Sequence, residues 1–162
     1  MTFLDFRDYA IPLFDEDLEA QSGLPESVLQ FKSLLKSHQR LLLACPEYNG
    51  SITPLLKNAL DWASRPEPSE HPMALSCFKG KIAALLATSP GRGGGARGLG
   101  HVRDILEMLG VTVLTDQVVI PSASHAFDDD GNLLDQQQHQ TVDAIAQQLV
   151  AVVAQPHLRY YQ

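Results

Sequence analysis

Cysteine, basic side chains and long hydrophobic runs are all scarce in this chain. Cys45 and Cys77 are its only cysteines and form no C-x-x-C pair, which fits a reduced cytoplasm better than a disulfide framework. Lysine and arginine number 12 against 19 acidic residues, giving a net charge of −7, so we expect no nucleic-acid partner. No apolar run approaches a membrane span, and the N-terminus has no signal-peptide pattern. A soluble, cytoplasmic protein with no membrane partner is therefore expected.

What is present is ordinary for a globular protein. Hydrophobic residues make up 44% and charged residues 19% of the 162 positions, enough for one domain with a sizeable core. No repeat and no composition shift marks a second domain. The sequence therefore predicts a single domain over residues 1–162.

Short apolar runs alternate with segments of helical periodicity, a pattern typical of an α/β sheet with parallel strands. We expect strands at 2–6, 40–45 and 81–88, and a last strand over 111–114 and 118–120 that breaks at Asp116. Helices are expected from Pro25 to Leu35, over 54–64, up to Leu109, and from Asp135 to Val153. The segments at 8–17 and 65–72 are expected to be loops, and 128–131 a turn.

The most informative stretch runs from Pro46 to Trp62. It follows Arg40–Cys45, an apolar run typical of a strand buried on both faces. Thr53 can cap a helix whose first residue is Pro54, where the missing N–H costs nothing. Strand, tight polar turn and helix thus follow one another, and ligands of open α/β sheets bind beyond the carboxyl ends of such strands.

The run Pro46–Trp62 (PEYNGSITPLLKNALDW) closely resembles the signature of the NAD(P)H-dependent FMN reductase family, which includes quinone, chromate and azo-dye reductases. This resemblance implies a flavodoxin-like three-layer α/β/α fold with a parallel sheet. It implies FMN and NAD(P)H as cofactors, hydride transfer from the nicotinamide to flavin N5, and a small acceptor such as a quinone. A homodimer or homotetramer is also implied.

The resemblance implies the flavin-binding residues as well. Those after the first apolar strand would meet the ribityl chain and ring, with amides near Asn49 and Gly50 facing N5 and O4: Pro46, Glu47, Tyr48, Asn49 and Gly50. Those of the glycine-rich segment would meet the other ring edge: Ser89, Pro90, Gly91 and Gly93. No side chain is needed as an acid or base, so no catalytic residue and no metal ligand is assigned.

The glycine-rich segment has two further interpretations. Gly91-x-Gly93-x-x-Ala96 is formally a dinucleotide fingerprint after a strand, with Asp116 at a plausible distance for a ribose. A plain flexible loop is about as plausible. Elsewhere, the histidines show no ligand spacing, Leu133 stands where a calcium loop over 128–132 needs glycine, and no Gly-x-Ser-x-Gly supports a hydrolase.

Family members begin one βα unit earlier, with a strand and a Gly-Ser-x-Arg-x-x-Ser-x-Asn loop that holds the FMN phosphate. Nothing in this chain matches that loop, so we expect the first strand and the phosphate-loop helix to be missing. A truncated gene model, a fragment completed by a partner, and a variant whose N-terminal strand moves inward all remain open; truncation is favoured. The contrasting function is a non-catalytic flavodoxin-like binding or assembly subunit without the phosphate site.

Overall fold

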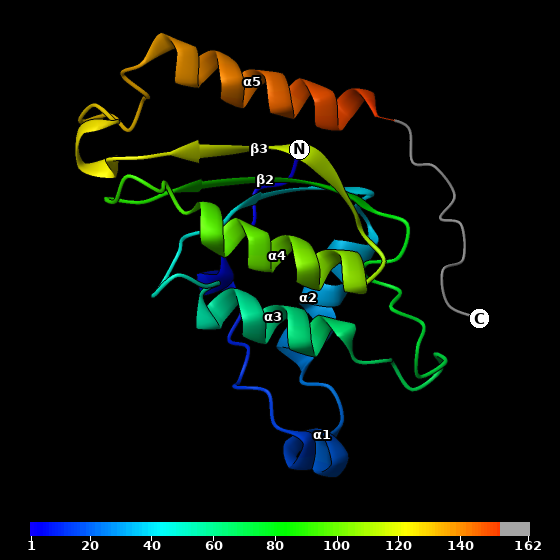
Figure 1. Cartoon of the computed structure of the whole chain (residues 1–162). Helices are drawn as coiled ribbons and strands as arrows, with labels where there is room; N and C mark the ends of the chain where they lie inside the picture. Colours follow the sequence, from blue (N-terminus) through cyan, green and yellow to red (C-terminus); the bar gives the residue numbers. More distant parts are fainter. Residues whose placement is uncertain (153–162) are drawn as a thin grey trace.

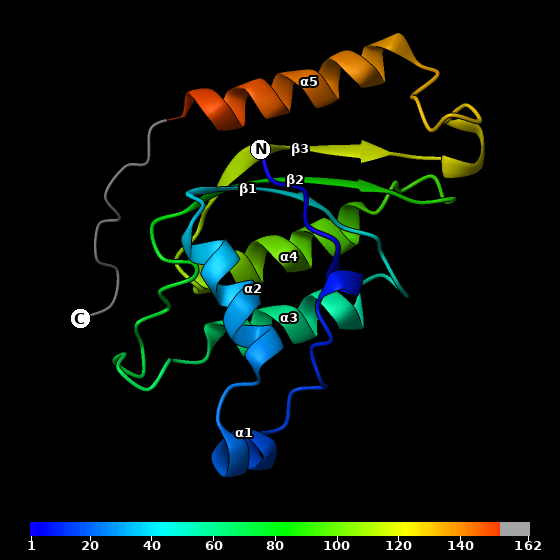
Figure 2. The same cartoon turned by 180° about the vertical axis from the view of Figure 1, so that it is seen from behind.

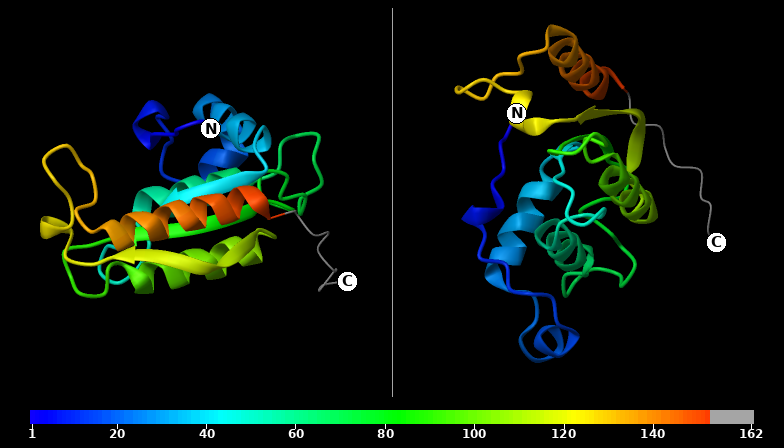
Figure 3. Two further views of the ribbon diagram at one scale, coloured as in Figure 1. Left: turned by 90° about the horizontal axis from the view of Figure 1, so that it is seen from above. Right: turned by 60° about the vertical axis from the view of Figure 1, so that its left-hand side comes forward.

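The computed structural model describes residues 1–152. Its centre is a parallel sheet of three strands in the order β1-β2-β3, formed by Arg40–Ala44, Ile82–Thr88 and Thr112–Ile120 (Figure 1). Helices α2 (Glu26–Lys36), α3 (Pro54–Ser64) and α4 (Ala96–Met108) cover one face. Helix α5 (Gln136–Ala151) covers the other (Figures 2 and 3). The predicted α/β/α layering with a parallel sheet is therefore confirmed.

Two apolar clusters, one on each side of the sheet, hold these layers together. On the α2–α4 side Phe31, Leu60, Leu85, Leu99 and Leu106 are all 8% exposed or less. On the α5 side the buried residues include Ile82, Leu114, Val118, Ile145 and Leu149. Successive residues of β2 face opposite clusters, which explains why this strand reads as an unbroken apolar run.

The start of α3 and the end of α4 lie where the capping residues predicted them. Thr53 Oγ1 accepts a hydrogen bond from the Leu56 N–H (3.2 Å) and Pro54 is the first residue of α3. Gly110, at φ +84°, follows α4. The expected break at Asp116 is a register shift inside one strand, because Ala83 pairs with Val113 and Leu85 with Gln117. Val153, the predicted end of the last helix, lies outside the described residues.

The strand predicted at 2–6 is wrong. Phe6–Asp8 is a 3-10 turn, capped by the Asp5 side chain, whose Oδ1 accepts the Arg7 N–H (2.8 Å). A local side-chain bond of this kind competes with an extended ladder. Leu4 and Phe6 instead pack on the edge of the α2–α4 cluster.

Two further expectations need correction. β1 is not buried on both faces: its residues alternate between exposed and half-buried, and Leu42 is 44% exposed. It is an edge strand of the described sheet, and α5 lies chiefly over β2 and β3. The structure also has a helix that was not predicted, α1 (Glu16–Ser22), which begins inside the segment 8–17 expected to be a loop. Its cap Asp15 accepts the N–H groups of Asp17 and Leu18.

Within residues 1–152 no helix is long and apolar enough to cross a membrane.

Candidate flavin site at the carboxyl edge of the sheet

Three loops gather where the parallel strands end, at the arrowheads in Figure 1. They follow β1, β2 and β3 and span residues 45–52, 89–95 and 121–126. The loop after β2 is joined to the end of β3 because the Ser89 N–H donates to the Ile120 carbonyl (3.3 Å). The loop after β3 is joined in turn, since the Ala123 N–H donates to the Ser89 carbonyl (3.0 Å). The loops after β2 and β3 are therefore joined to each other.

The loop after β1 closes in a tight turn at Asn49–Gly50. Tyr48 and Ser51 exchange two backbone hydrogen bonds of 3.0 Å each. Asn49 (φ +52°) and Gly50 (φ +76°) both have the positive φ that a two-residue type I′ turn requires. Neither N–H of these two residues has an acceptor in the described part of the chain. The turn thus leaves two main-chain donors available to a ligand.

The side chains of this loop differ in how far they are exposed to solvent. Tyr48 is 58% exposed, and Pro46 and Asn49 are also exposed. Glu47 is half-buried, and its Oε2 accepts a hydrogen bond from the Gly98 N–H of α4 (2.7 Å). Cys45 lies behind the loop at 4% exposure, and this burial raises the pKa of its thiol to about 11. Cys45 is therefore a packing residue and no thiolate nucleophile.

The glycine-rich loop is exposed at its start and buried at its end. Gly91 and Gly93 are exposed to solvent. Within residues 1–152 neither N–H group donates a hydrogen bond. Gly95 is buried at φ +91°, and a Cβ there would lie 2.7 Å from the Ala87 Cβ. The chain therefore needs glycine at 95 to let the loop pass close over β2 and enter α4.

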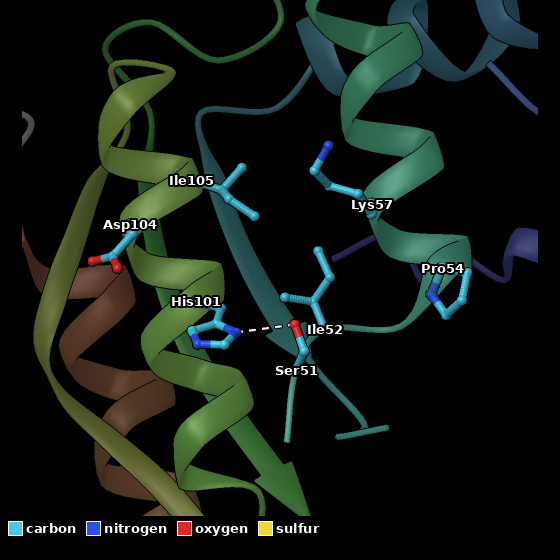
Figure 4. A pocket seen from close by; sticks show the side chains of 7 residues that line it. All are labelled: Ser51, Ile52, Pro54, Lys57, His101, Asp104 and Ile105. Atoms are coloured by element: carbon cyan, nitrogen blue, oxygen red, sulfur yellow. Dashed lines mark hydrogen bonds between the residues drawn. The ribbon is translucent and has the colours of Figure 1, made fainter. Parts of the chain in front are cut away.

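A shallow groove of about 500 Å³ adjoins the Asn49–Gly50 turn, between α3 and α4 (Figure 4). Ser51 Oγ and His101 Nδ1 share a hydrogen bond of 2.9 Å across its mouth, and Ile52 and Ile105 form an apolar wall. A second hollow, around Phe14–Asp17, shares no residue with the three loops. Among the described residues no group of three or more His, Cys, Asp and Glu is arranged to hold a metal ion.

The structure brings both predicted segments to one edge of the sheet: Pro46 to Gly50 after β1, and Ser89 to Gly93 after β2. Asp116, required by the dinucleotide interpretation, lies in mid-strand four residues before Ile120. At 3.3 Å per residue this is about 13 Å from the edge, which disfavours that interpretation.

The loop at 121–126 was not found from the sequence. The feature that distinguishes this loop is Ser122, a non-glycine residue at φ +54°. Its N–H donates a hydrogen bond to the Gly91 carbonyl (3.3 Å). Positive φ at serine is uncommon and cannot be read from residue types alone.

The residues present fit a flat, redox-active ring with carbonyl and nitrogen edges. The N–H groups of Asn49 and Gly50 on one loop and of Gly91 and Gly93 on the next, which have no acceptor among the described residues, supply donors, and three of these four residues are glycines that let a ring approach closely. The first turn of α4 adds the positive end of a helix dipole to the same edge.

Comparison with known proteins agrees with this geometry. The family model described as NADPH-dependent FMN reductase matches residues 1–125. An NAD(P)H-dependent FMN reductase from Pseudomonas aeruginosa is 45% identical over 143 residues, covering 88% of this chain and 71% of that protein. A probable NADPH:quinone oxidoreductase 2 from Oryza sativa is 36% identical over 128 residues, and the chain spans only 59% of its length.

Among solved structures, the flavoenzyme FerB of Paracoccus denitrificans, an NAD(P)H:(acceptor) oxidoreductase, superposes with a TM-score of 0.71 at 31% identity, over 87% of this chain and 76% of FerB. An NADH:FMN oxidoreductase, EMOB, shares the fold with a TM-score of 0.58 at 22% identity, over 90% of this chain and 72% of EMOB. With the match over residues 1–125, these findings show that the chain belongs to the NADPH-dependent FMN reductase family and has its flavodoxin-like fold.

Proposed function

We propose that this chain is an NAD(P)H-dependent, FMN-using oxidoreductase that passes electrons to a quinone-type or other small acceptor. The observation that carries the proposal is the pair of loops at the carboxyl edge of the sheet. Both present main-chain N–H groups that have no acceptor among the described residues, in a chain that belongs to a flavin reductase family. The name of the Oryza sativa relative supports the quinone class of acceptor.

The proposed contacts follow from which groups face outward. The turn at Asn49–Gly50 donates to one edge of the ring, and the segment from Ser89 to Gly93 lines the other. Pro46 and Tyr48 supply exposed surface beside the turn. Bound FMN supplies the hydride chemistry, and the protein supplies position and electrostatics. No side chain is assigned as a general acid or base.

Three coarser features belong to the same proposal. We propose that residues 1–162 belong to one flavodoxin-like domain, that the protein works in the cytoplasm, and that it forms a homodimer or homotetramer. The apolar wall of the groove between α3 and α4 and the exposed Met108 and Leu55 support self-association.

The test compares two glycines that share a backbone conformation. Gly50 (φ +76°) forms the proposed contact turn, whereas Gly131 (φ +84°) lies in the 128–131 turn, outside the proposed contact segments, with no atom near its missing Cβ. We expect Gly50→Ala to weaken FMN binding at least tenfold, because a Cβ at positive φ, 2.9 Å from Arg97 Nη1, strains the turn and moves its N–H donors out of position. Gly131→Ala should bind as the parent chain does. FMN fluorescence quenching gives the affinity, and NADPH oxidation with 1,4-benzoquinone gives the activity.

An inert protein that never quenches FMN would contradict the proposal and favour a non-catalytic binding subunit. Equal losses in the two variants would also contradict the proposed position of the site.

A further inference from the structure

Helix α4 begins without a cap of its own. Its N-cap is Gly95, which has no side chain to offer, and no acidic residue lies in its first turn. Arg97 places a positive charge there, where the helix dipole is itself positive. Four N–H groups of a helix start need acceptors. This end of α4 therefore requires an acceptor, preferably anionic, from elsewhere in the chain.

Glu47 supplies it from the loop after β1. Its Oε2 accepts the Gly98 N–H at 2.7 Å, in a partly buried position. Gly98 is the third residue of α4, the position whose N–H a capping side chain normally binds. Glu47 thus performs, across 51 residues of chain, the task that Ser, Thr or Asp usually performs locally.

The approach of α4 to this loop is too close for larger residues. A Cβ on Gly98 would lie 3.2 Å from Glu47 Cγ and 3.3 Å from the Ser51 carbonyl. On the other side of the turn, His101 bonds Ser51, and a Cβ on Gly50 would come within 2.9 Å of Arg97 Nη1. One helix therefore holds the 47–51 loop at both ends, and within residues 1–152 the carboxylate bond between them is that of Glu47.

We propose that Glu47 is a positioning residue that joins the two flavin-binding loops, and that its carboxylate is not a ligand of the ring. Because α4 continues directly from the glycine-rich loop, the bond to Gly98 fixes the separation between the Asn49–Gly50 amides and the Gly91–Gly93 amides. This replaces the direct ring contact that the family resemblance implied for Glu47. That FMN is the ligand of these loops rests on the proposed function, whereas the claim that Glu47 joins the two loops does not.

Hydrogen–deuterium exchange of the flavin-free chain tests whether Glu47 joins the two loops. Glu47→Ala should speed amide exchange about 10- to 100-fold in both 47–51 and 91–98, the loss expected for one charge-assisted bond. Glu107→Ala, on an exposed face at the other end of α4, is the matched control and should leave both segments unchanged. Faster exchange in only one of the two loops, or in neither, would overturn the proposal.

Two conservative variants separate positioning from charge. Gln keeps the acceptor and the length, while Asp keeps the charge but is one methylene shorter. Positioning predicts that Glu47→Gln, which loses only the charge contribution, exchanges at most about tenfold faster than the parent chain, and that Glu47→Asp behaves like the alanine variant. The reverse order would show that the carboxylate charge matters and would overturn the proposal. If Glu47→Ala fails to fold, the comparison of these two variants still tests whether Glu47 positions the loops.

FMN affinity then relates the bond to the site. Glu47→Gln should keep the FMN dissociation constant within about threefold, and Glu47→Asp should raise it about tenfold. A large loss with Gln and none with Asp would identify the carboxylate as a flavin ligand instead. If the parent chain takes up no FMN, the proposed function fails while the exchange experiment still decides whether Glu47 joins the loops.

Discussion

At the scale of single residues, the glycines near α4 differ in what a methyl group would meet. At Gly95 an added Cβ would lie 2.7 Å from the Ala87 Cβ, and φ is +91°. At Gly100, inside the same helix, nothing lies within 4 Å. Helix propensity favours alanine at Gly100, whereas Gly95 is the N-cap of α4, where glycine is preferred over alanine, so the two substitutions separate helix propensity from cap conformation and close packing.

We expect Gly95→Ala to destabilise the protein by roughly 2–4 kcal/mol, from left-handed strain plus overpacking. Gly100→Ala should stabilise it by about 0.5–1 kcal/mol, because alanine loses less backbone entropy in a helix. Urea unfolding of the flavin-free proteins measures both. Similar shifts of the same sign in the two variants would contradict this account of Gly95.

Residue types revealed where a donor or a cap can be, but not where a side chain points. Thr53, Pro54 and Gly110 were predicted correctly because capping depends on neighbours in sequence. Glu47 could not be predicted in the same way. Its partner Gly98 is 51 residues away, and only the packing of α4 on the β1 loop brings them together.

At the scale of elements, α2 is tied to the loop at 65–72 by buried and half-buried charges. Lys32 is 1% exposed, and its Nζ donates to the Ala63 carbonyl (3.4 Å) and to the Arg65 carbonyl at the end of α3. Lys36 Nζ bonds Glu70 Oε1 (2.8 Å), and the Glu67 N–H donates to Glu70 Oε2 (3.0 Å). The Glu67 N–H first, and the Lys36 ammonium second, lower the pKa of Glu70 from 4.5 to about 2.

This arrangement predicts a pH dependence. A carboxyl group whose pKa is lower in the folded state stabilises the fold above its unfolded pKa, and that stabilisation is lost as the pH falls. We expect Glu70 to contribute about 1–2 kcal/mol at pH 6, allowing for solvent screening, and to lose it between pH 4.5 and about 2. The difference in unfolding free energy between the parent chain and Glu70→Gln should shrink over this range. A difference in unfolding free energy that stays constant over this pH range would contradict the prediction.

Elements with strong periodicity were predicted well, and those that depend on neighbours were not. The apolar faces of α2, α3 and α4 and the buried run of β2 are visible in sequence because burial repeats along them. The strand expected at 2–6 and the burial of β1 required a neighbouring strand that the described residues do not contain. Helix α1 was missed because its seven residues bury no side chain.

At the scale of the whole molecule, the fold class followed from alternation and the site from topology. Parallel strands joined by helices put all their carboxyl ends on one edge. Loops at 46–50 and 89–93 therefore had to meet at this edge, although 38 residues lie between them in the sequence. The third loop, after β3, follows from the same topology, but its residues carried no recognisable pattern.

The most direct test of the central claim is an amide NMR titration of this chain with FMN, carried to millimolar concentration. A flavin gripped by main-chain donors of two loops should shift the amide resonances of Asn49, Gly50, Gly91 and Gly93 together, with one dissociation constant. Resonances at the opposite edge of the sheet, such as those of Lys79 and Gly110, should stay in place. Absent shifts at saturating FMN, or shifts centred away from these two loops, would contradict the account.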